Sequence, residues 1–393
     1  DPLLDAMLPI PPRVQVPATI NGQIMPGDTD CFTFYARKGQ QLVMDAQARR
    51  LHPYLADAVP GWFQATLALY DTNGNEMAFT DDYRLQPDPV MLFNVPADGE
   101  YRIEIRDAIY RGREDFVYRI SVSEQPFITK MFPLGGCAGS PAIVTISGWN
   151  LPGERVTLDT RAGGGHIRET AWRKGSLLAN RLPYAVDTLP ECAEAETNDT
   201  TQTAQNIALP VIVNGRISHA GDIDVFAFHA SAGDRVVAEV RARRLFSPLD
   251  SLVRLTDASG RVLAWNDDFE DKGMGLDTHH ADSYISTNLP ATGMYFIHVA
   301  DSQHHGGDAY AYRLRISPPR PGFELRMAPS SINAAAGRAV PINVFAMRKD
   351  GFDGGIDIVL TNAPDGFTLS GARIPPGRDS VRMTLMAPGG ATS

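Results

Sequence analysis

The hydrophobic pattern of this chain of 393 residues alternates with a period of two in many short segments. Gly, Pro, Asn and Asp residues bound these segments, the clearest of which are residues 31–35, 66–70, 101–105, 118–122, 323–327, 340–344, 356–360 and 381–385. Period-two alternation between turn residues is typical of half-buried β-strands. No segment of comparable length shows a convincing helical period, so the sequence predicts an all-β protein.

The chain contains two copies of one long segment, at residues 21–123 and 214–317. From Asp88 to Ser123 the sequence aligns with Asp282 to Ser317 without a gap. Both copies also contain Gly-Asp-x-Asp and Ala-Arg-Arg-Leu motifs, at residues 27–30 and 48–51 in the first copy and at residues 221–224 and 242–245 in the second. A repeat of this length indicates a duplicated domain, because solenoid units are about 20–50 residues long.

Each copy contains a predicted β-hairpin. Asn73-Gly74 lies between two apolar runs in the first copy, and Ser259-Gly260 lies at the matching place in the second. Gly-containing dipeptides of this kind favour the tight turns that join antiparallel strands.

Changes of composition divide the chain into domains. Residues 1–18 are rich in proline, an acidic linker runs from Glu191 to Thr200, and Pro318-Pro319-Arg320-Pro321 ends the second copy. Proline clusters of this kind mark boundaries, because proline interrupts regular structure. After an extended segment at 1–18, we expect tandem β-sandwich domains at residues 19–124, 125–187, 188–318 and 319–393.

The composition of the chain argues against several classes of function. The net charge of −10 is spread along the chain, which argues against a surface for nucleic acid or for an anionic membrane. No apolar run approaches the 18 or so residues that span a bilayer. Cys31, Cys137 and Cys192 lack the spacing of a zinc site. Cys137 and Cys192 flank one expected domain, so the alternatives are a disulfide between them or three idle thiols.

The repeated unit resembles the bacterial pre-peptidase C-terminal domain, a jelly-roll β-sandwich. The residues that carry the resemblance in the second copy are Gly221–Phe228, Leu255-x-Asp257-x-x-Gly260, Asn266–Asp268 and Gly293–Val299. Between the copies, Phe132–Gly136 and Gly148-Trp149-Asn150-Leu151 are similar to the opening of immunoglobulin-like domains of the IPT or TIG type. The last domain looks like another immunoglobulin-like sandwich without its final strand. This alternation resembles multidomain exported proteins of planctomycete-type bacteria.

The resemblance implies a calcium site in the second copy. Relatives attached to collagenases bind Ca²⁺ through an acidic linker that folds back on the first strands, and hard carboxylate and amide oxygens are the ligands that Ca²⁺ prefers. The residues that match this pattern are Glu194, Glu196, Asn198, Asp199, Asp222 and Asp224. The first copy keeps Asp28 and Asp30, but the proline-rich residues 9–17 occupy the place of its linker. The alternative is a solvated acidic linker.

Further acidic residues suggest a second metal site at one end of the sandwich. Its members are Asp250, Asn266, Asp267, Asp268 and Asp282. In the first copy, Asp81, Asp82 and Asp88 stand at the positions of Asp267, Asp268 and Asp282. Turn geometry is the alternative explanation for these carboxylates.

The resemblance implies a non-catalytic accessory array that is stabilised by calcium and exported to the periplasm, the cell surface or the medium. Such an array would anchor, space or bind a surface protein or polysaccharide for a larger protein, of which this chain is a piece. The rival hypothesis is a carbohydrate- or protein-binding module of a secreted hydrolase, and an exposed aromatic platform would favour it. From the pattern around them, we expect the tryptophans, Trp265 and Trp149 above all, to pack in cores.

Overall fold

The computed structural model describes residues 10–51, 62–84, 86–163, 166–175, 177–269, 282–329 and 331–390. The regular structure in these residues is nearly all β, which confirms the predicted fold class. Helical structure in the same residues is limited to two 3₁₀ turns, Arg49–Leu51 and Arg243–Leu245. Within the described part of the chain, no helix has the length and apolar character needed to cross a membrane.

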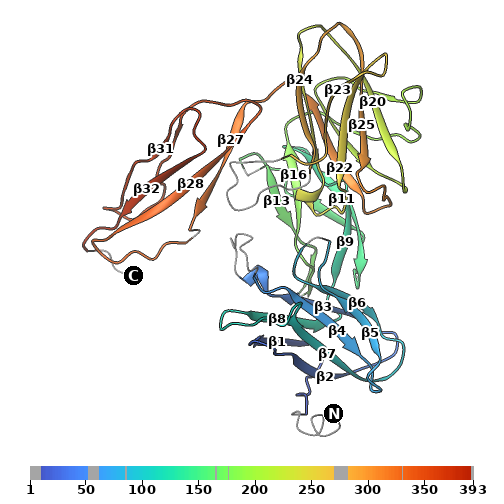
Figure 1. Cartoon of the computed structure of the whole chain (residues 1–393), viewed down its shortest axis with the longest axis vertical. Coiled ribbons are helices and arrows are strands. Elements are labelled where there is room, and N and C mark those ends of the chain that lie inside the picture. Colours follow the sequence, from blue (N-terminus) through green and yellow to red (C-terminus); the bar gives the residue numbers. More distant parts are fainter. Residues whose placement is uncertain are drawn as a thin grey trace. The chain divides into compact units, whose positions relative to one another are not determined.

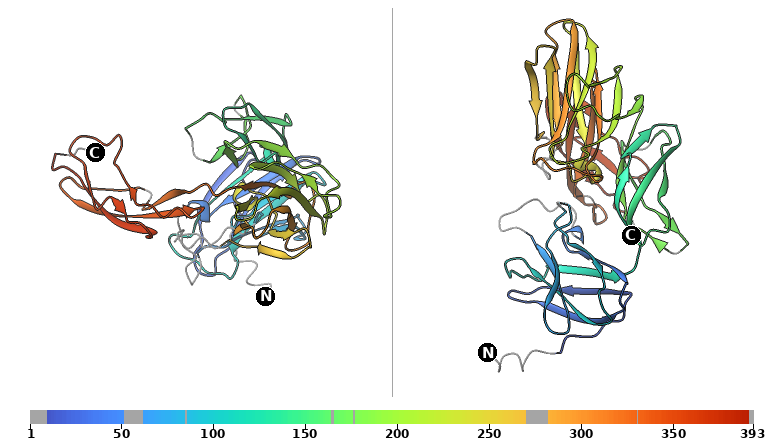
Figure 2. Two further views of the ribbon diagram at one scale, coloured as in Figure 1. Left: turned by 90° about the horizontal axis from the view of Figure 1, so that it is seen from above. Right: turned by 90° about the vertical axis from the view of Figure 1, so that its right-hand side faces the viewer.

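The chain forms two compact units, residues 1–188 with 245–248 and residues 189–244 with 249–393. Each unit holds one copy of the repeat and one further sandwich (Figures 1 and 2). Among the described residues, every sheet draws its strands from a single one of the four expected domains.

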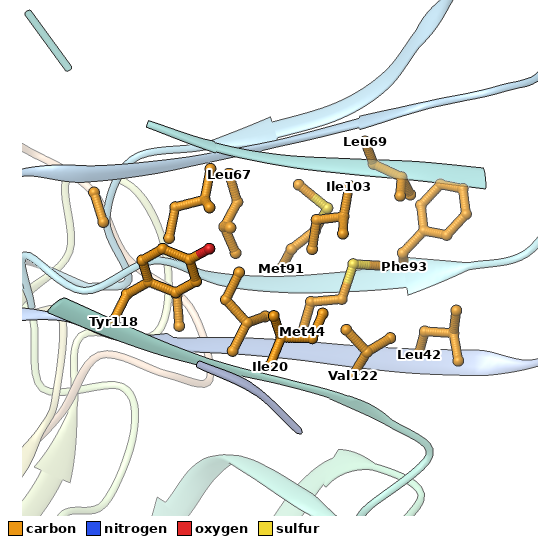
Figure 3. Close-up of a cluster of buried hydrophobic side chains, with 14 of the residues drawn as sticks. Ile20, Leu42, Met44, Leu67, Leu69, Met91, Phe93, Ile103, Tyr118 and Val122 are labelled. Atoms are coloured by element: carbon orange, nitrogen blue, oxygen red, sulfur yellow. The ribbon is translucent and has the colours of Figure 1, made fainter. Parts of the chain in front are cut away.

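The first copy of the repeat is a sandwich of two four-stranded antiparallel sheets, in the orders β1-β8-β3-β6 and β2-β7-β4-β5. The strands are β1 (Ala18–Gln23), β2 (Asp30–Ala36), β3 (Gln41–Gln47), β4 (Ala65–Tyr70), β5 (Glu76–Thr80), β6 (Val90–Asn94), β7 (Gly99–Asp107) and β8 (Val117–Ser123). Figure 3 shows side chains from both sheets, such as Leu42 and Leu67, in one buried cluster. Alternate residues of each strand therefore fill a single core.

The second copy has the same plan, with one additional strand on each sheet. Its sheets run β17-β19-β26-β21-β24 and β18-β20-β25-β22-β23. The strands are β17 (Glu191–Ala193), β18 (Gln205–Asn206), β19 (Val211–Arg216), β20 (Ile223–Ala230), β21 (Arg235–Arg241), β22 (Ser251–Asp257), β23 (Val262–Asn266), β24 (Tyr284–Asn288), β25 (Gly293–Asp301) and β26 (Ala311–Ser317). β17 and β18 both pair in parallel, with β19 and β20 respectively. The segment from Glu191 to Asn206 therefore begins beside one sheet and ends beside the other.

Both predicted hairpins are confirmed. β4 pairs with β5 across Asn73-Gly74, and β22 pairs with β23 across Ser259-Gly260. Gly74 and Gly260 have φ angles of +82° and +84°, which only glycine adopts without strain.

Residues 125–187 form two three-stranded sheets, β12-β11-β9 and β10-β16-β13, and a short hairpin of β14 and β15. The strands are β9 (Phe127–Phe132), β10 (Gly135–Cys137), β11 (Ala142–Trp149), β12 (Arg155–Leu158), β13 (Ile167–Thr170), β14 (Arg173–Lys174), β15 (Leu177–Leu178) and β16 (Leu182–Asp187). Asn150 follows β11 with φ +53°, so the chain turns where the Gly-x-Asn-Leu motif predicts a turn.

The last sandwich consists of sheets β27-β28-β32-β30 and β29-β31. The strands are β27 (Gly322–Ala328), β28 (Ala339–Lys349), β29 (Ile356–Asp357), β30 (Thr368–Ser370), β31 (Arg373–Ile374) and β32 (Ser380–Met386). The strand predicted at residues 356–360 is wrong beyond Asp357, and Val359 is 75% exposed. The partner segment turns at Gly371 (φ +71°), and the strand before that turn pairs with β32 instead.

The three cysteines carry free thiols. The disulfide between Cys137 and Cys192, one of the two alternatives, is therefore not formed, and all three side chains are half-buried.

Candidate metal centre

The acidic linker is held against the first strands of the second repeat by main-chain hydrogen bonds. The N–H of Glu194 donates to the carbonyl oxygen of Asn214 at 3.0 Å, beside β19. The N–H of Val225, in β20, donates to the carbonyl oxygen of Asn198 at 2.8 Å. These two bonds fix both ends of the Glu-x-Glu-x-Asn-Asp segment, so its side chains meet the Gly-Asp-x-Asp turn that precedes β20.

Five of the six predicted ligands lie in two overlapping groups. Glu194, Glu196 and Asp224 form one group, and Glu196, Asp199 and Asp222 form the other. Within each group, one carboxylate oxygen per residue lies within 4.8 Å of the others. Because Glu196 belongs to both groups, the five carboxylates form a single cluster. This cluster, with Asn198, is called the acidic site below.

Several oxygens of the acidic site are buried and have no hydrogen-bond partner. They are Oε1 of Glu194, Oδ1 of Asn198, Oδ1 of Asp222 and Oδ1 of Asp224, and the amide nitrogen of Asn198 is also unpaired. Buried polar atoms without a partner are rare in folded proteins, because each costs about 1–3 kcal/mol. A cation bound among these oxygens would satisfy several of them together.

The other carboxylate oxygens of the same residues are firmly held. Oε2 of Glu194 accepts a hydrogen bond from the N–H of Arg216 at 2.7 Å, and Oδ2 of Asp222 accepts one from the N–H of Ser218 at 2.6 Å. Oδ2 of Asp224 accepts one from the hydroxyl of Tyr312 at 2.6 Å. Each of the three carboxylates is thus oriented by one oxygen, while the other oxygen is left for a ligand.

Burial and mutual repulsion make the site unfavourable for negative charge. Burial, together with the neighbouring carboxylate of Glu194, raises the pKa of Asp224 well above its usual value. Burial also raises the pKa of Glu194. A divalent cation reverses this effect, because its charge stabilises the ionised carboxylates. The donor set of carboxylate and amide oxygens suits Ca²⁺.

Tyr312 and Gly215 belong to the site, and the sequence analysis missed both. A Cβ atom on Gly215 would lie 2.4 Å from the hydroxyl oxygen of Tyr312 and 2.9 Å from Oε2 of Glu194, so only glycine fits there. The recurrence of a glycine and a tyrosine at the same positions of both copies could have identified them. Gly22 and Tyr118 make the same close approach in the first copy, and the hydroxyl of Tyr118 donates to Oδ2 of Asp30 at 2.5 Å.

The first copy lacks the rest of the arrangement in its described residues. Arg13 forms a parallel bridge with Thr33, at the place where Asn206 pairs with Ala227 in the second copy. The proline-rich segment therefore matches β18 rather than the acidic linker, which corrects the sequence analysis. The counterpart of the linker would fall before residue 10, outside the described residues. Asp28 and Asp30 are half-buried, and among the residues that the structure describes no acidic group of three includes them.

The residues of the second candidate site are occupied with other partners. Asp282 is buried and accepts hydrogen bonds from the N–H groups of Ala242 and Arg243 and from Nε of Arg244. Its counterpart Asp88 does the same for Arg49 and Arg50. These aspartates hold the 3₁₀ turn within the Ala-Arg-Arg-Leu motif, so turn geometry explains their recurrence.

The other members do not gather around Asp282 in a metal-like group. Oδ1 of Asn266 accepts the N–H of Tyr284, and Oδ2 of Asp250 accepts an amide N–H of Gln303. Asp267 and Asp268 lie in the turn after β23, as Asp81 and Asp82 do after β5. In the described residues, none of them belongs to a group of three metal-ligating side chains. We therefore propose no metal at this second position.

Trp265 does not pack in the core, contrary to the expectation. Its side chain is 62% exposed. β23 lies at the edge of its sheet. Trp265 pairs with Arg254, which points out of the sandwich, whereas the neighbouring pair Ala264–Leu255 faces the core. Phe79 occupies the same register position in the first copy and is 48% exposed. Trp149, by contrast, packs partly buried against Phe127.

Similarity to a curated protein covers a short stretch of the chain. No protein-family model matches the chain. A stretch of 80 residues, 20% of this chain, is 42% identical to a protein of Deinococcus radiodurans described as a probable subtilase-type serine protease. The match covers only a tenth of that relative's length.

Among solved structures, the chain is similar to the pre-peptidase C-terminal domain of a Bacillus anthracis collagenase (18% identity, TM-score 0.22, 29% of this chain and 95% of that domain). It is also similar to a mutant periplasmic inhibitor of g-type lysozyme from Escherichia coli (17% identity, TM-score 0.20, 29% of this chain and 98% of that one). At such TM-scores these likenesses lend no weight to a shared activity.

Proposed function

We propose that the acidic site of the second repeat binds Ca²⁺ and that the cation fastens the linker to the sandwich. The observation that carries this proposal is the set of buried, unpaired oxygens on Glu194, Asn198, Asp222 and Asp224. Glu196 and Asp199 add exposed carboxylates to the same cluster. A dense group of buried carboxylates without a counter-ion would be unstable when ionised, so a cation gives the arrangement a physical reason.

The cation would stiffen the chain where the second compact unit begins. The unit starts at Leu189, and the acidic site begins at Glu194. Fixing a segment of about ten residues removes backbone freedom worth about 1–2 kcal/mol per residue, and ligand binding offsets that cost. A linker held in this way acts as part of the domain rather than as a flexible tether.

In this proposal the chain is a non-catalytic accessory array of an exported protein. Its sandwiches would anchor, space or bind a surface protein or polysaccharide. Support comes from the Deinococcus relative, in which the matched stretch is a tenth of a described protease and so leaves room for catalysis elsewhere. The net charge of −10 agrees with a role outside nucleic-acid binding.

A thermal melt of the full chain with excess Ca²⁺ and with EDTA tests the calcium site. Selective binding at 100 times the dissociation constant adds about 2.7 kcal/mol to the free energy of unfolding, so the melting temperature should rise in Ca²⁺. Asp222→Asn removes one ligand charge and should abolish most of the rise. Asp268→Asn, outside the acidic site, is the matched control and should keep it. Equal melts in Ca²⁺ and EDTA for the unsubstituted chain would refute the proposal.

A second candidate function rests on the exposed aromatic rings. Trp265 and Phe79 stand at one register position of the two repeats, and exposed aromatic rings on sandwich faces stack on sugars. We propose polysaccharide binding at these rings as the alternative role. Retention of the chain on an insoluble polysaccharide should fall in the double variant Trp265→Ala and Phe79→Ala. Retention that is unchanged in this variant would rule the alternative out.

A further inference from the structure

A pocket of about 260 Å³ lies within the second unit, between the second repeat and the last sandwich. One wall is the outer face of β21, β24 and β26, which contributes Arg235, Ser286 and Arg315. The other wall is the end of β28 with Arg348, and Phe269 also lines the space. The volume lies near the lower end of the range for ligand sites, about 300–1,000 Å³, so it suits a ligand of monosaccharide size.

The floor of the pocket is a buried ion-pair network that joins the two sandwiches. Arg315 donates to both carboxylate oxygens of Asp350, at 2.6 and 2.9 Å, and through Nε to Glu239 at 3.0 Å. Burial raises the pKa of Glu239, but the charges of Arg241, Arg244 and Arg315 outweigh burial and hold that pKa well below its usual value. Burial likewise raises the pKa of Asp350, but the hydrogen bonds and charge of Arg315 outweigh burial and lower that pKa, so both carboxylates of the floor are ionised and paired.

More cationic than anionic side chains line the pocket. The lining cations are Arg235, Arg244, Arg315, Arg348 and Lys349, and the lining carboxylates are Glu239 and Asp350. Outside the lining, Asp282 pairs with Arg244, Glu324 with Lys349, and the exposed Asp379 lies 3.5 Å from Arg348. Arg235 is exposed and donates from Nε to the hydroxyl of Ser286 at 3.1 Å. No carboxylate partner of Arg235 is found among the described residues, and its side chain lines the pocket.

The first repeat shows that this polar lining is not needed to attach a neighbouring sandwich. At the register positions of Arg235, Ser286 and Arg315 it carries Gln41, Leu92 and Ser121. There the junction with the next sandwich is apolar, with Val43, Val90 and Phe127 buried together. The second repeat carries polar and cationic residues where the first makes an apolar contact, and a cavity lies beside them.

An aromatic pair completes the wall of the pocket. The rings of Phe269 and Tyr284 lie 4.7 Å apart between centroids, and both line the space. An apolar ring face beside hydrogen-bonding groups suits a sugar ring, while Arg235 supplies a partner for one negative charge. We propose that the pocket binds a uronic acid, a monosaccharide that bears a carboxylate, at the end or within a chain of an acidic polysaccharide.

Titration calorimetry of the full chain, with galacturonate and glucuronate as probes and galactose and glucose as their neutral counterparts, tests this inference. The acids should bind more tightly than the neutral sugars. Arg235→Gln installs the residue of the first repeat and should weaken uronate binding by about 10-fold or more, because a charge-assisted hydrogen bond is lost. Arg261→Gln, an exposed arginine of the β22–β23 turn, is the matched control and should bind as the unsubstituted chain does.

Three outcomes would overturn the inference. They are absence of binding by both acids, equal affinity for acids and neutral sugars, and unchanged affinity in Arg235→Gln. Tighter binding of a short peptide through its free C-terminal carboxylate than of either uronate would also overturn it, because the recognised class would then be a protein end. Circular dichroism of the variants checks that they fold, which the exposure of Arg235 leads us to expect.

Discussion

Two buried aspartates of the second repeat have different surroundings. Asp282 accepts hydrogen bonds at both oxygens, from main-chain N–H groups and from Arg244. Asp224 accepts one at Oδ2 from Tyr312, and its Oδ1 is buried and unpaired. The number of donors around a carboxylate, rather than the local density of acidic residues, therefore separates an aspartate that holds a turn from a candidate metal ligand.

This difference predicts that substitutions of the two aspartates change the effect of Ca²⁺ on stability differently. Asp282→Asn should lower the free energy of unfolding by about 1–3 kcal/mol in Ca²⁺ and in EDTA alike, because it leaves buried donors unsatisfied. Asp224→Asn should remove the gain from Ca²⁺ but leave stability in EDTA unchanged or higher, because it removes the cost of burying an ionisable carboxyl group. Urea unfolding with and without Ca²⁺ measures both. A loss of the calcium increment in Asp282→Asn equal to that in Asp224→Asn would contradict the assignment.

His298 predicts a pH dependence that is separate from the acidic site. It lies on β25, where its Nε2 is 3.1 Å from the hydroxyl oxygen of Thr256. Burial, with the charge of Arg254, lowers the pKa of His298 to about 4, whereas an unfolded histidine titrates near 6.5. Arg254 faces it from β22, and the facing residue of β20 is the apolar Val225. The unfolded state therefore takes up the proton first as the pH falls.

Stability should thus decline as the pH falls from about 6.5 towards 4, because protonation then favours the unfolded state. His298→Gln keeps a polar partner for Thr256 but does not titrate, so its decline over this interval should be shallower. Unfolding in denaturant at several pH values, for both chains, measures the difference. Parallel curves for the two chains would show that His298 has no share in the pH dependence.

At the scale of the element, strand β19 is restricted by the acidic site beside it. Gly215→Ala places a Cβ atom within 2.4 Å of the Tyr312 hydroxyl and near Glu194, so it should destabilise the chain by about 1–3 kcal/mol and weaken Ca²⁺ binding. Gly293→Ala, at the start of β25, is the control, since a Cβ there meets no atom within 4 Å. Thermal melts in Ca²⁺ and EDTA compare the two. Equal stability of both variants would show that the residues around Gly215 move to accommodate the added Cβ atom at little cost.

Much of the fold could be predicted from the sequence, because strands reveal themselves locally. Alternation marked β2, β4, β7 and β8, and the Gly-containing dipeptides marked the turns, since each signal depends on residues close in the chain. β29 ended early because its length depends on a distant partner that turns at Gly371. Trp265 was misjudged for a similar reason, because its outward direction follows from register on an edge strand.

The candidate site was predictable in part. The linker motif and the Gly-Asp-x-Asp turn identified the carboxylates that the structure brings together. Their resemblance to a known pattern supplied that pairing, because no local rule places Glu194 beside Asp224. The hydroxyl of Tyr312 reaches Asp224 from a strand 88 residues further along the chain. Only the recurrence of both residues in the first copy, as Asp30 and Tyr118, could have linked them.

At the scale of the whole molecule, each repeat receives the following sandwich on the same face of the same sheet. The first junction is apolar, around Val43 and Phe127, whereas the second depends on Arg315 and Asp350. Buried ion pairs stabilise little when intact, but removing one partner leaves an unpaired buried charge. The two junctions should therefore respond differently to single substitutions.

Asp350→Ala should lower the stability of the second unit by about 3 kcal/mol, because Arg315 is left without its main partner. Arg348→Ala, which removes hydrogen bonds to main-chain carbonyls of the last sandwich, should not expose the second repeat in the same way. Hydrogen exchange of β26 and β28 separates the two effects. Unchanged protection of β26 in Asp350→Ala would contradict a stabilising role for the pair.

The two short strands β17 and β18 have a further consequence for solubility. β17 pairs with β19 and β18 pairs with β20, so each covers the open side of one sheet. Uncovered strand edges offer free N–H and C=O groups to other chains and promote edge-to-edge aggregation. A second repeat that began at Leu209 would expose both edges at once. By covering these edges, β17 and β18 should reduce self-association of the protein. A cation that holds the linker in place would strengthen this effect.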